Sequence, residues 1–131
     1  MTYYERKLTR IKNIHYSNQG QIDTVIGTRN YIDNNFEKAL NLDLLSFVRF
    51  TSKYHLLRLF KRYYGITPRQ YLIDKRIEKA KECLKNGMPV TQTCFSIGFE
   101  SPSSFSNLFK NRIGMTPSEF QKSNFQEVSQ R

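Results

Sequence analysis

The 131-residue chain has no tryptophan, only two cysteines and few acidic side chains. Cys83 and Cys94 are accompanied by no further cysteines or histidines at the spacing of a zinc site. Two cysteines in a lysine-rich chain indicate reduced thiols in the cytosol rather than a disulfide-linked scaffold. We expect both to serve as small apolar packing residues.

The patterns of an enzyme and of a membrane protein are also missing. His15 and His55 have no nucleophile or metal ligand at a recognised spacing, and no glycine-rich phosphate loop follows a strand. No apolar run approaches the length of a bilayer span. We therefore expect no catalytic residue, no metal or other cofactor, and no membrane contact.

Positive charge is what the chain has in excess. Lysine and arginine outnumber aspartate and glutamate 21 to 11, which gives a formal net charge of +10. Such a molecule is attracted to polyanions before any specific contact forms. A basic surface that only confers solubility is an equally good interpretation of the charge alone.

The strongest pattern is an internal repeat. In each copy a serine precedes a short helical pattern with a polar outer face, a glycine ends it, and Thr-Pro opens another helix. The matching residues, 49 positions apart, are Ser52, Leu59, Phe60, Lys61, Gly65, Thr67 and Pro68, and Ser101, Leu108, Phe109, Lys110, Gly114, Thr116 and Pro117. The chain therefore contains two copies of one supersecondary unit.

Apolar spacing and capping residues divide the rest of the chain. Tyr4, Leu8, Ile11 and His15 share one face of a basic amphipathic segment, which we expect to end at residues 17–20. This arm could contact DNA, bind a partner or dock on the core. The expected division is an arm or helix over 1–23, a first subdomain over 24–67, a linker helix over 68–87, a second subdomain over 88–122 and a fraying polar tail over 123–131.

Within these regions we expect individual helices. One runs from about Ile22 to Phe36, with Ile26 on its apolar stripe. A short helix then opens at Asn41 or Asp43 and turns four apolar residues inward. His55 or Leu56 begins the inward set of the next helix, which ends at Tyr64, and His55 is expected to pack beneath it. Tyr63 closes the same inward set, and a last short helix lies around Phe120.

Taken in order, the residues of this chain resemble the DNA-binding domain of the AraC/XylS family over about residues 25–122. The resemblance is carried by Tyr31-Ile32, the run from Ser52 to Lys61, Gly65-Ile66-Thr67-Pro68, Tyr71, Arg76, Ala80, Gly98-Phe99-Glu100-Ser101, Phe105, Leu108-Phe109-Lys110 and Gly114-Met115-Thr116-Pro117. The first copy departs from the family at Phe50 and Thr51, where the turn often has a small residue or glycine, and at Ser46, where alanine is frequent. Phe50 leaves the angle of the first recognition helix open.

The resemblance implies an all-α fold of two helix-turn-helix subdomains joined by a linker helix. About seven helices, plus an N-terminal helix in the arm, would make up the chain. The helices near Ser52 to Tyr64 and Ser101 to Arg112 would be recognition helices. Such paired helices reach successive major grooves, roughly 34–36 Å apart on one face of the duplex.

The candidate DNA contacts lie on and beside these two helices, and in the first of them helix geometry and the resemblance agree on the exposed face. The residues predicted to read bases are Lys53, Tyr54, Leu57, Arg58, Ser103, Ser104 and Asn107. Those predicted to contact phosphates are Ser52, Lys61, Arg62, Ser101, Lys110, Asn111 and Arg112. Arg58 can bond bidentately to guanine, or instead clamp a phosphate or form an internal ion pair, and Asn107 suits adenine.

The family implies a bacterial transcription regulator that recognises specific sequences in double-stranded DNA. It would be a cytoplasmic, nucleoid-associated activator that binds DNA as a monomer, or as a dimer, and presents a surface to RNA polymerase. Two alternatives stay open. The chain could be the DNA-binding part of a split regulator that a partner controls through residues 1–23, or a nonspecific nucleic-acid or protein adaptor that uses only its charge. Excess competitor DNA would distinguish specific from nonspecific binding.

Overall fold

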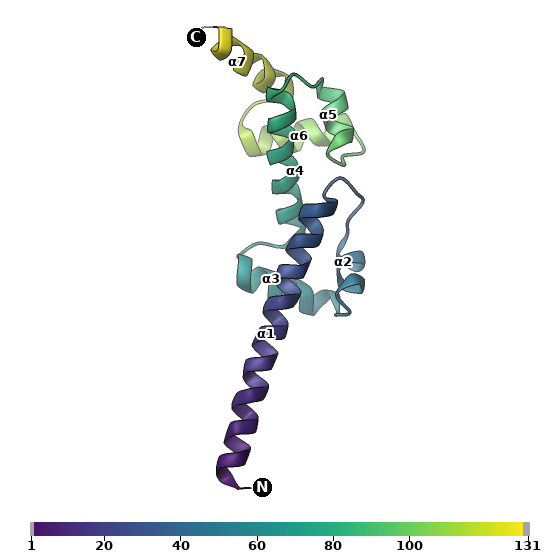
Figure 1. Ribbon diagram of the computed structural model, residues 1–131. Coiled ribbons are helices and arrows are strands. Elements are labelled where there is room, and N and C mark those ends of the chain that lie inside the picture. Colours follow the sequence, from purple (N-terminus) through teal and green to yellow (C-terminus); the bar gives the residue numbers. More distant parts are fainter. Residues whose placement is uncertain (1, 130–131) are drawn as a thin grey trace. The chain divides into compact units, whose positions relative to one another are not determined.

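The computed structural model describes the backbone of residues 2–129 and the side chains of residues 2–3, 5–7 and 18–125. Within this part of the chain all regular structure is helical, which confirms the all-α prediction (Figure 1). The helices are α1 (Tyr3–Asn35), α2 (Leu42–Val48), α3 (Lys53–Tyr64), α4 (Pro68–Lys85), α5 (Val90–Ser96), α6 (Pro102–Ile113) and α7 (Pro117–Ser129).

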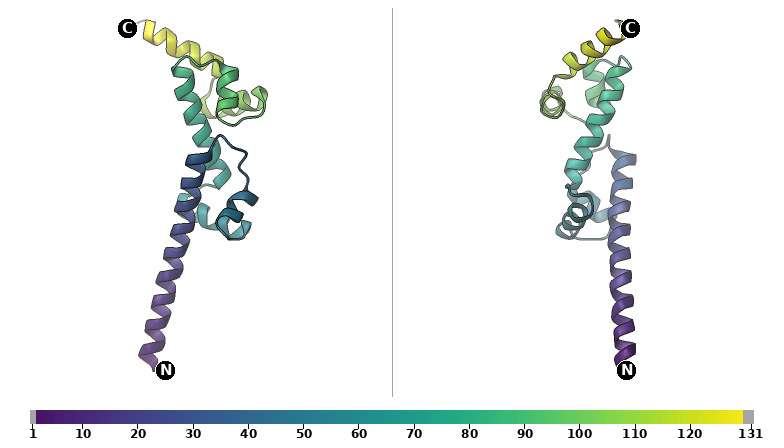
Figure 2. Two further views of the ribbon diagram at one scale, coloured as in Figure 1. Left: turned by 45° about the vertical axis from the view of Figure 1, so that its right-hand side comes forward. Right: turned by 90° about the vertical axis from the view of Figure 1, so that its left-hand side faces the viewer.

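The chain forms two compact units. The first contains the chain up to Asn34 together with Asn41–Arg69, and the second contains Asn35–Leu40 and everything from Gln70 onward. Helices α2 and α3 pack together in the first unit, and in the second unit α6 packs against both α5 and α7 (Figure 2). The helices that follow the two repeated serines, α3 and α6, therefore lie in different units, each packed against the short helix before it.

Helix α1 is continuous across the predicted break at residues 17–20, so that prediction was wrong. Gly20 stays helical, and its carbonyl accepts a hydrogen bond from the Thr24 hydroxyl (2.9 Å). Glycine inside a helix costs only about 1 kcal/mol relative to alanine, which neighbouring residues can offset. The apolar face predicted at Tyr4, Leu8, Ile11 and His15 falls outside the described side chains.

Buried side chains of the first unit come from all three of its helices. Each helix presents apolar residues at helical spacing, and a small residue from α1 and one from α2 are buried with them. They are Val25, Thr28 and Ile32 of α1, Leu45 and Ser46 of α2, and Leu56, Leu59 and Phe60 of α3. Ile26 and Tyr63, both expected to face inward, are instead about 40% exposed.

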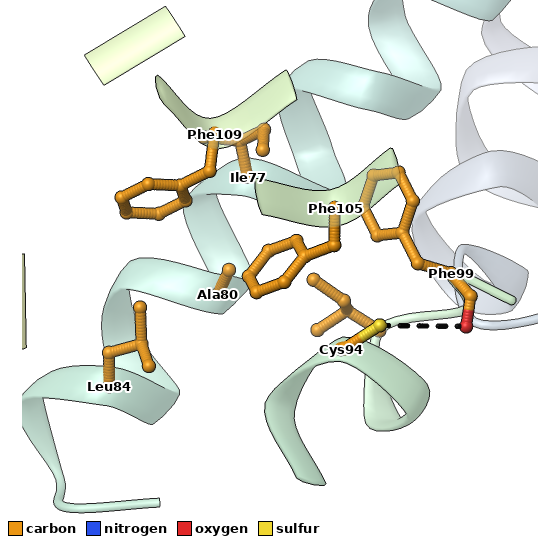
Figure 3. Close-up of a cluster of buried hydrophobic side chains, with 8 residues drawn as sticks. Ile77, Ala80, Leu84, Cys94, Phe99, Phe105 and Phe109 are labelled. Carbon is orange, nitrogen blue, oxygen red and sulfur yellow. Dashed lines mark hydrogen bonds between the residues drawn. The ribbon is translucent and has the colours of Figure 1, made fainter. Parts of the chain in front are cut away.

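The second unit is built around α4 and a set of aromatic rings (Figure 3). The ring centroid of Phe105 lies 5.4 Å from that of Phe99 and 5.8 Å from that of Phe109. Around them the cluster contains Ile77, Ala80 and Leu84 of α4, with Cys94 and Ile97. Ile77, Ala80 and Leu84 are three and four residues apart, so they place one apolar face of α4 in this core.

Of the two cysteines, Cys94 is fully buried and Cys83 half-buried. The Cys94 thiol donates a weak hydrogen bond to the Phe99 carbonyl (4.0 Å), and burial raises the pKa of this thiol. The predicted packing role therefore fits Cys94 more closely than Cys83.

Helix α7 is longer than the short helix predicted around Phe120 and continues to Ser129, where a fraying tail was expected. The side chain of Gln121 holds α7 to the end of α4. Its amide nitrogen donates to the carbonyl oxygens of Leu84 (3.1 Å), in the last turn of α4, and of Met88 (2.8 Å), just after this helix. These two contacts link the backbone at the end of α4 to α7.

Candidate nucleic-acid interface

Both helical pairs have a turn with the same backbone hydrogen bonds. In the first turn the amides of Phe50 and Thr51 donate to the carbonyls of Phe47 (3.1 Å) and Ser46 (3.0 Å). In the second, Gly98 and Phe99 donate to Phe95 (3.2 Å) and Cys94 (3.1 Å). The two turns are therefore equivalent at an offset of 48 residues, one fewer than the offset of the helices that follow them.

The extra residue lies between the second turn and its following helix. Only Thr51 separates Phe50 from the N-cap Ser52, whereas Phe99 and Glu100 separate Gly98 from the N-cap Ser101. Phe99 is buried in the core of the second unit. Because the Phe99 amide makes the same turn bond as that of Thr51, the extra residue is Glu100, which is exposed just ahead of the N-cap of α6.

The start and end signals of α3 and α6 are those expected from the sequence. The hydroxyl oxygens of Ser52 and Ser101 accept hydrogen bonds from the amides of His55 (3.1 Å) and Ser104 (3.3 Å). At the other ends, Gly65 (φ 77°) and Gly114 (φ 92°) are left-handed. Both predicted recognition helices thus have defined lengths and polar N-termini.

On α3, burial of Leu56, Leu59 and Phe60 leaves the predicted reading face outward. The remaining predicted residues of this helix share one exposed region, apart from Leu57, which is half-buried. Lys53, Tyr54, Arg58, Lys61 and Arg62 are exposed, and Tyr54 is 80% exposed. The structure therefore brings the α3 candidates together, and their DNA contacts stay a prediction.

His55 is exposed, so the prediction that it packs beneath α3 was wrong. Leu56 occupies the inward position instead, one turn before Leu59 and Phe60. The backbone amide of His55 donates to the hydroxyl of Ser52 at the N-cap. His55 is thus an additional candidate at the N-terminus of α3, one turn from Arg58.

On α6, Phe105 and Phe109 are buried and the polar candidates are exposed. The exposed set comprises Ser103, Ser104, Asn107, Lys110, Asn111 and Arg112, whereas Ser101 is half-buried at the cap. Most of these side chains are neutral, in contrast to the cations of α3. The two helices offer different chemistry to a ligand.

Two predicted contacts already have an acidic partner. The Lys53 ammonium lies 2.8 Å from a carboxylate oxygen of Asp43, and this hydrogen bond and charge raise the pKa of Lys53. Arg112 forms an ion pair with Asp74 of α4. Within residues 18–125, whose side chains are described, Arg58 and Lys61 have no such partner.

Arg76 of α4 positions the turn of the second motif. Its guanidinium donates to the carbonyls of Phe36 (2.7 Å) and Lys38 (2.8 Å) and lies 5.5 Å from the centre of the Phe99 ring. Burial lowers the pKa of Arg76, an effect that the nearby Glu37 partly opposes. Arg76 thereby fixes residues 35–40 against the turn before α6.

Candidate metal sites and membrane spans are both absent from the described residues. No group of three or more histidine, cysteine, aspartate or glutamate side chains there could hold a metal ion. No helix in the same part of the chain is both long and apolar enough to span a membrane.

Comparison with known sequences gives consistent matches. A family model described as a helix-turn-helix domain matches residues 46–123, more than half of the chain. The probable transcriptional regulator LumQ of Photobacterium leiognathi is 38% identical over 93 residues, which cover 70% of this chain and 38% of LumQ. The chain thus matches well under half of the length of this curated relative.

Solved structures agree with the sequence matches. The C-terminal domain of AraT, a response regulator from Geobacillus stearothermophilus, is similar with a TM-score of 0.74 and 27% identity, over 76% of this chain and 84% of that domain. A transcriptional regulator from Chromobacterium violaceum, described as AraC-type, has a TM-score of 0.68 and 25% identity, over 83% of this chain and 96% of its own.

Proposed function

Because the chain belongs to the AraC family of helix-turn-helix DNA-binding domains, we propose that it is a transcription regulator that recognises specific sequences in double-stranded DNA. The observation that carries this proposal is the repeated motif, in which α3 and α6 follow equivalent turns and expose polar faces. The major groove admits an α-helix, and the base edges there are distinguishable. Two such helices in one chain support recognition of two blocks of sequence.

The side chains of α3 and α6 indicate a division of roles. Arg58 suits a bidentate contact with guanine, and Tyr54 can pack against a thymine methyl group. Lys61 and Arg62 suit phosphates. On α6, Asn107 suits adenine. We therefore assign most of the affinity to α3 and finer discrimination to α6.

A single protomer with two reading helices would recognise an asymmetric site. Successive major grooves on one face of the duplex are roughly 34–36 Å apart. Activation, through a surface presented to RNA polymerase, and a cytoplasmic location are further parts of the proposal, and they rest on the family. LumQ, a probable transcriptional regulator, is consistent with a role in transcription.

Selection of binding sites from random duplex at near-physiological salt tests the proposal. We expect enrichment of an asymmetric site with two conserved blocks about one helical turn apart. One block alone would contradict reading by both helices. If no sequence were enriched over the starting pool, sequence-specific recognition would be wrong.

The net charge of +10 favours one competing function, a nonspecific adaptor that binds polyanions. Such binding would be lost when unlabelled random duplex is added in excess. Binding to the selected site should persist under the same competition. Control by a partner through residues 1–23 predicts instead that specific binding appears only when that partner is added.

A further inference from the structure

Each recognition helix has one cation paired with a carboxylate of its own unit. Lys53, the first residue of α3, pairs with Asp43 in the first turn of α2, and these side chains are 53% and 72% exposed. Arg112, in the last turn of α6, pairs with Asp74 of α4, and these are 37% and 49% exposed. Both pairs are therefore accessible to a polyanion from solution.

A neighbouring carboxylate changes what such a cation can do. Before Lys53 or Arg112 can bind a phosphate, its ion pair must break or the phosphate must approach the carboxylate, and like charges at close range repel. Arg58 and Lys61 carry no such cost, since neither has an acidic partner among the described side chains. The cations of the two helices thus fall into a paired and an unpaired class.

This difference matters most for nonspecific binding, which consists almost entirely of phosphate contacts. At a correct site, base contacts add free energy that can offset the breaking of an ion pair. At an unrelated sequence they add none, so the cost stays uncompensated. A carboxylate that competes with phosphate therefore weakens nonspecific binding.

We propose that Asp43 and Asp74 withhold Lys53 and Arg112 from DNA phosphates, so that the protein binds unrelated sequences less tightly than it would without these carboxylates. This inference rests on the proposed function, since it assigns a role to residues beside the same two helices. It adds two acidic residues, which are not DNA ligands, to the groups that set the affinity for nonspecific DNA. A role confined to folding would instead leave nonspecific binding unchanged.

The variants Asp43→Asn and Asp74→Asn test the proposal, with Glu78→Gln as the control. Glu78 is exposed on α4, and in the described part of the chain it has no cationic partner. Glu78→Gln removes one negative charge, as each aspartate variant does, but it breaks no ion pair. Binding to a short random duplex is measured by fluorescence anisotropy over a range of salt concentrations. Thermal unfolding of each variant, followed by circular dichroism, establishes that it is folded.

For each aspartate variant we expect the plot of log affinity against log salt to become steeper by about 0.9, the value for one added phosphate contact. Affinity for random duplex should rise about three- to tenfold near 0.1 M salt. Glu78→Gln should leave the slope unchanged. If both aspartate variants matched Glu78→Gln in slope and affinity, the proposal would be wrong.

A double-mutant cycle separates release of Lys53 from any other effect of Asp43→Asn. In a Lys53→Met background, Asp43→Asn should no longer raise affinity for random duplex. A gain that persists in this background would contradict the mechanism. These measurements need no known operator, so they remain decisive for the inference even if site selection enriched no sequence and the proposed function failed.

Discussion

The turn before α3 and the turn before α6 have the same hydrogen bonds but very different surroundings. The first places Phe50 in a left-handed conformation (φ 53°) with its side chain 95% exposed. The second places Gly98 there (φ 96°), half-buried beside Glu37 and Arg76. A bulky residue in this conformation is strained, whereas glycine is not. The motif thus tolerates strain where the turn is open to water.

The difference lies in what covers each turn. Residues 35–40, held by the guanidinium of Arg76, pass close to Gly98. At the first turn the exposed rings of Phe47, Phe50 and Tyr54 lie at the surface instead. Glycine is therefore needed at the second turn for two reasons, the left-handed backbone and the lack of space for a Cβ. At the first turn the backbone conformation is the same, but neighbouring atoms do not crowd the side chain.

The largest expected effect is that of Gly98→Ala on stability. A Cβ at this position would lie 2.8 Å from the Glu37 carbonyl oxygen and 2.9 Å from Nη2 of Arg76, in a left-handed backbone conformation. Strain and contact together should lower the free energy of unfolding by about 2–4 kcal/mol. Denaturant-induced unfolding, followed by circular dichroism, measures this loss.

Gly114→Ala is the matched control. Gly114 is also left-handed (φ 92°), but a Cβ there would meet nothing within 4 Å. Its substitution should therefore show the conformational cost alone, about 1–2 kcal/mol. Equal losses for the two variants would show that residues 35–40 do not constrain the second turn.

The next effect sharpens the comparison between α3 and α6, the two predicted recognition helices. Arg58→Ala should remove about 1–3 kcal/mol of discrimination at one base position of the selected site. Asn107→Ala should relax a position in the other block, by less if α6 only tunes recognition. Competition between matched and single-mismatch duplexes measures both effects. Equal loss of affinity on every duplex with Arg58→Ala would assign this residue to a phosphate.

Lys61→Ala provides the contrasting behaviour expected of a phosphate contact. It should weaken binding to all sequences alike and lower the salt slope by about 1. A change in base preference with this variant would contradict its assignment. Arg58 and Lys61 are exposed on the same helix, so the pair compares the two roles within one surface.

Local signals in the sequence predicted much of this fold. Ser52 and Ser101 begin helices and Gly65 and Gly114 end them, because capping and left-handed conformations depend on neighbouring residues alone. The continuity of α1 past Gly20 and the extension of α7 to Ser129 were missed, because glycine and a polar composition favour a helix end without enforcing one.

The candidate site was predictable to a similar extent. Helical spacing identified the exposed faces of α3 and α6. It placed His55 beneath α3, whereas the structure exposes His55 and buries the next residue, Leu56. The ion pairs of Lys53 and Arg112 were not predicted, because Asp43 and Asp74 lie on other helices and only the folded units bring them close. The bases that these faces read depend on contacts with DNA and stay predictions.

The smallest expected effect is that of a substitution that gives the first turn the glycine found in the second. Phe50→Gly should relieve the left-handed strain, worth roughly 1–2 kcal/mol, while glycine loses about 0.5–1 kcal/mol more conformational entropy on folding. The exposed ring contributes little packing, so we expect a net stabilisation of about 0.5–1 kcal/mol, seen as a higher denaturation midpoint. Phe50→Ala removes the ring but keeps a Cβ in the strained conformation, and it should leave the midpoint nearly unchanged. If alanine stabilised the protein as much as glycine, the exposed ring rather than the backbone would be the source of the cost.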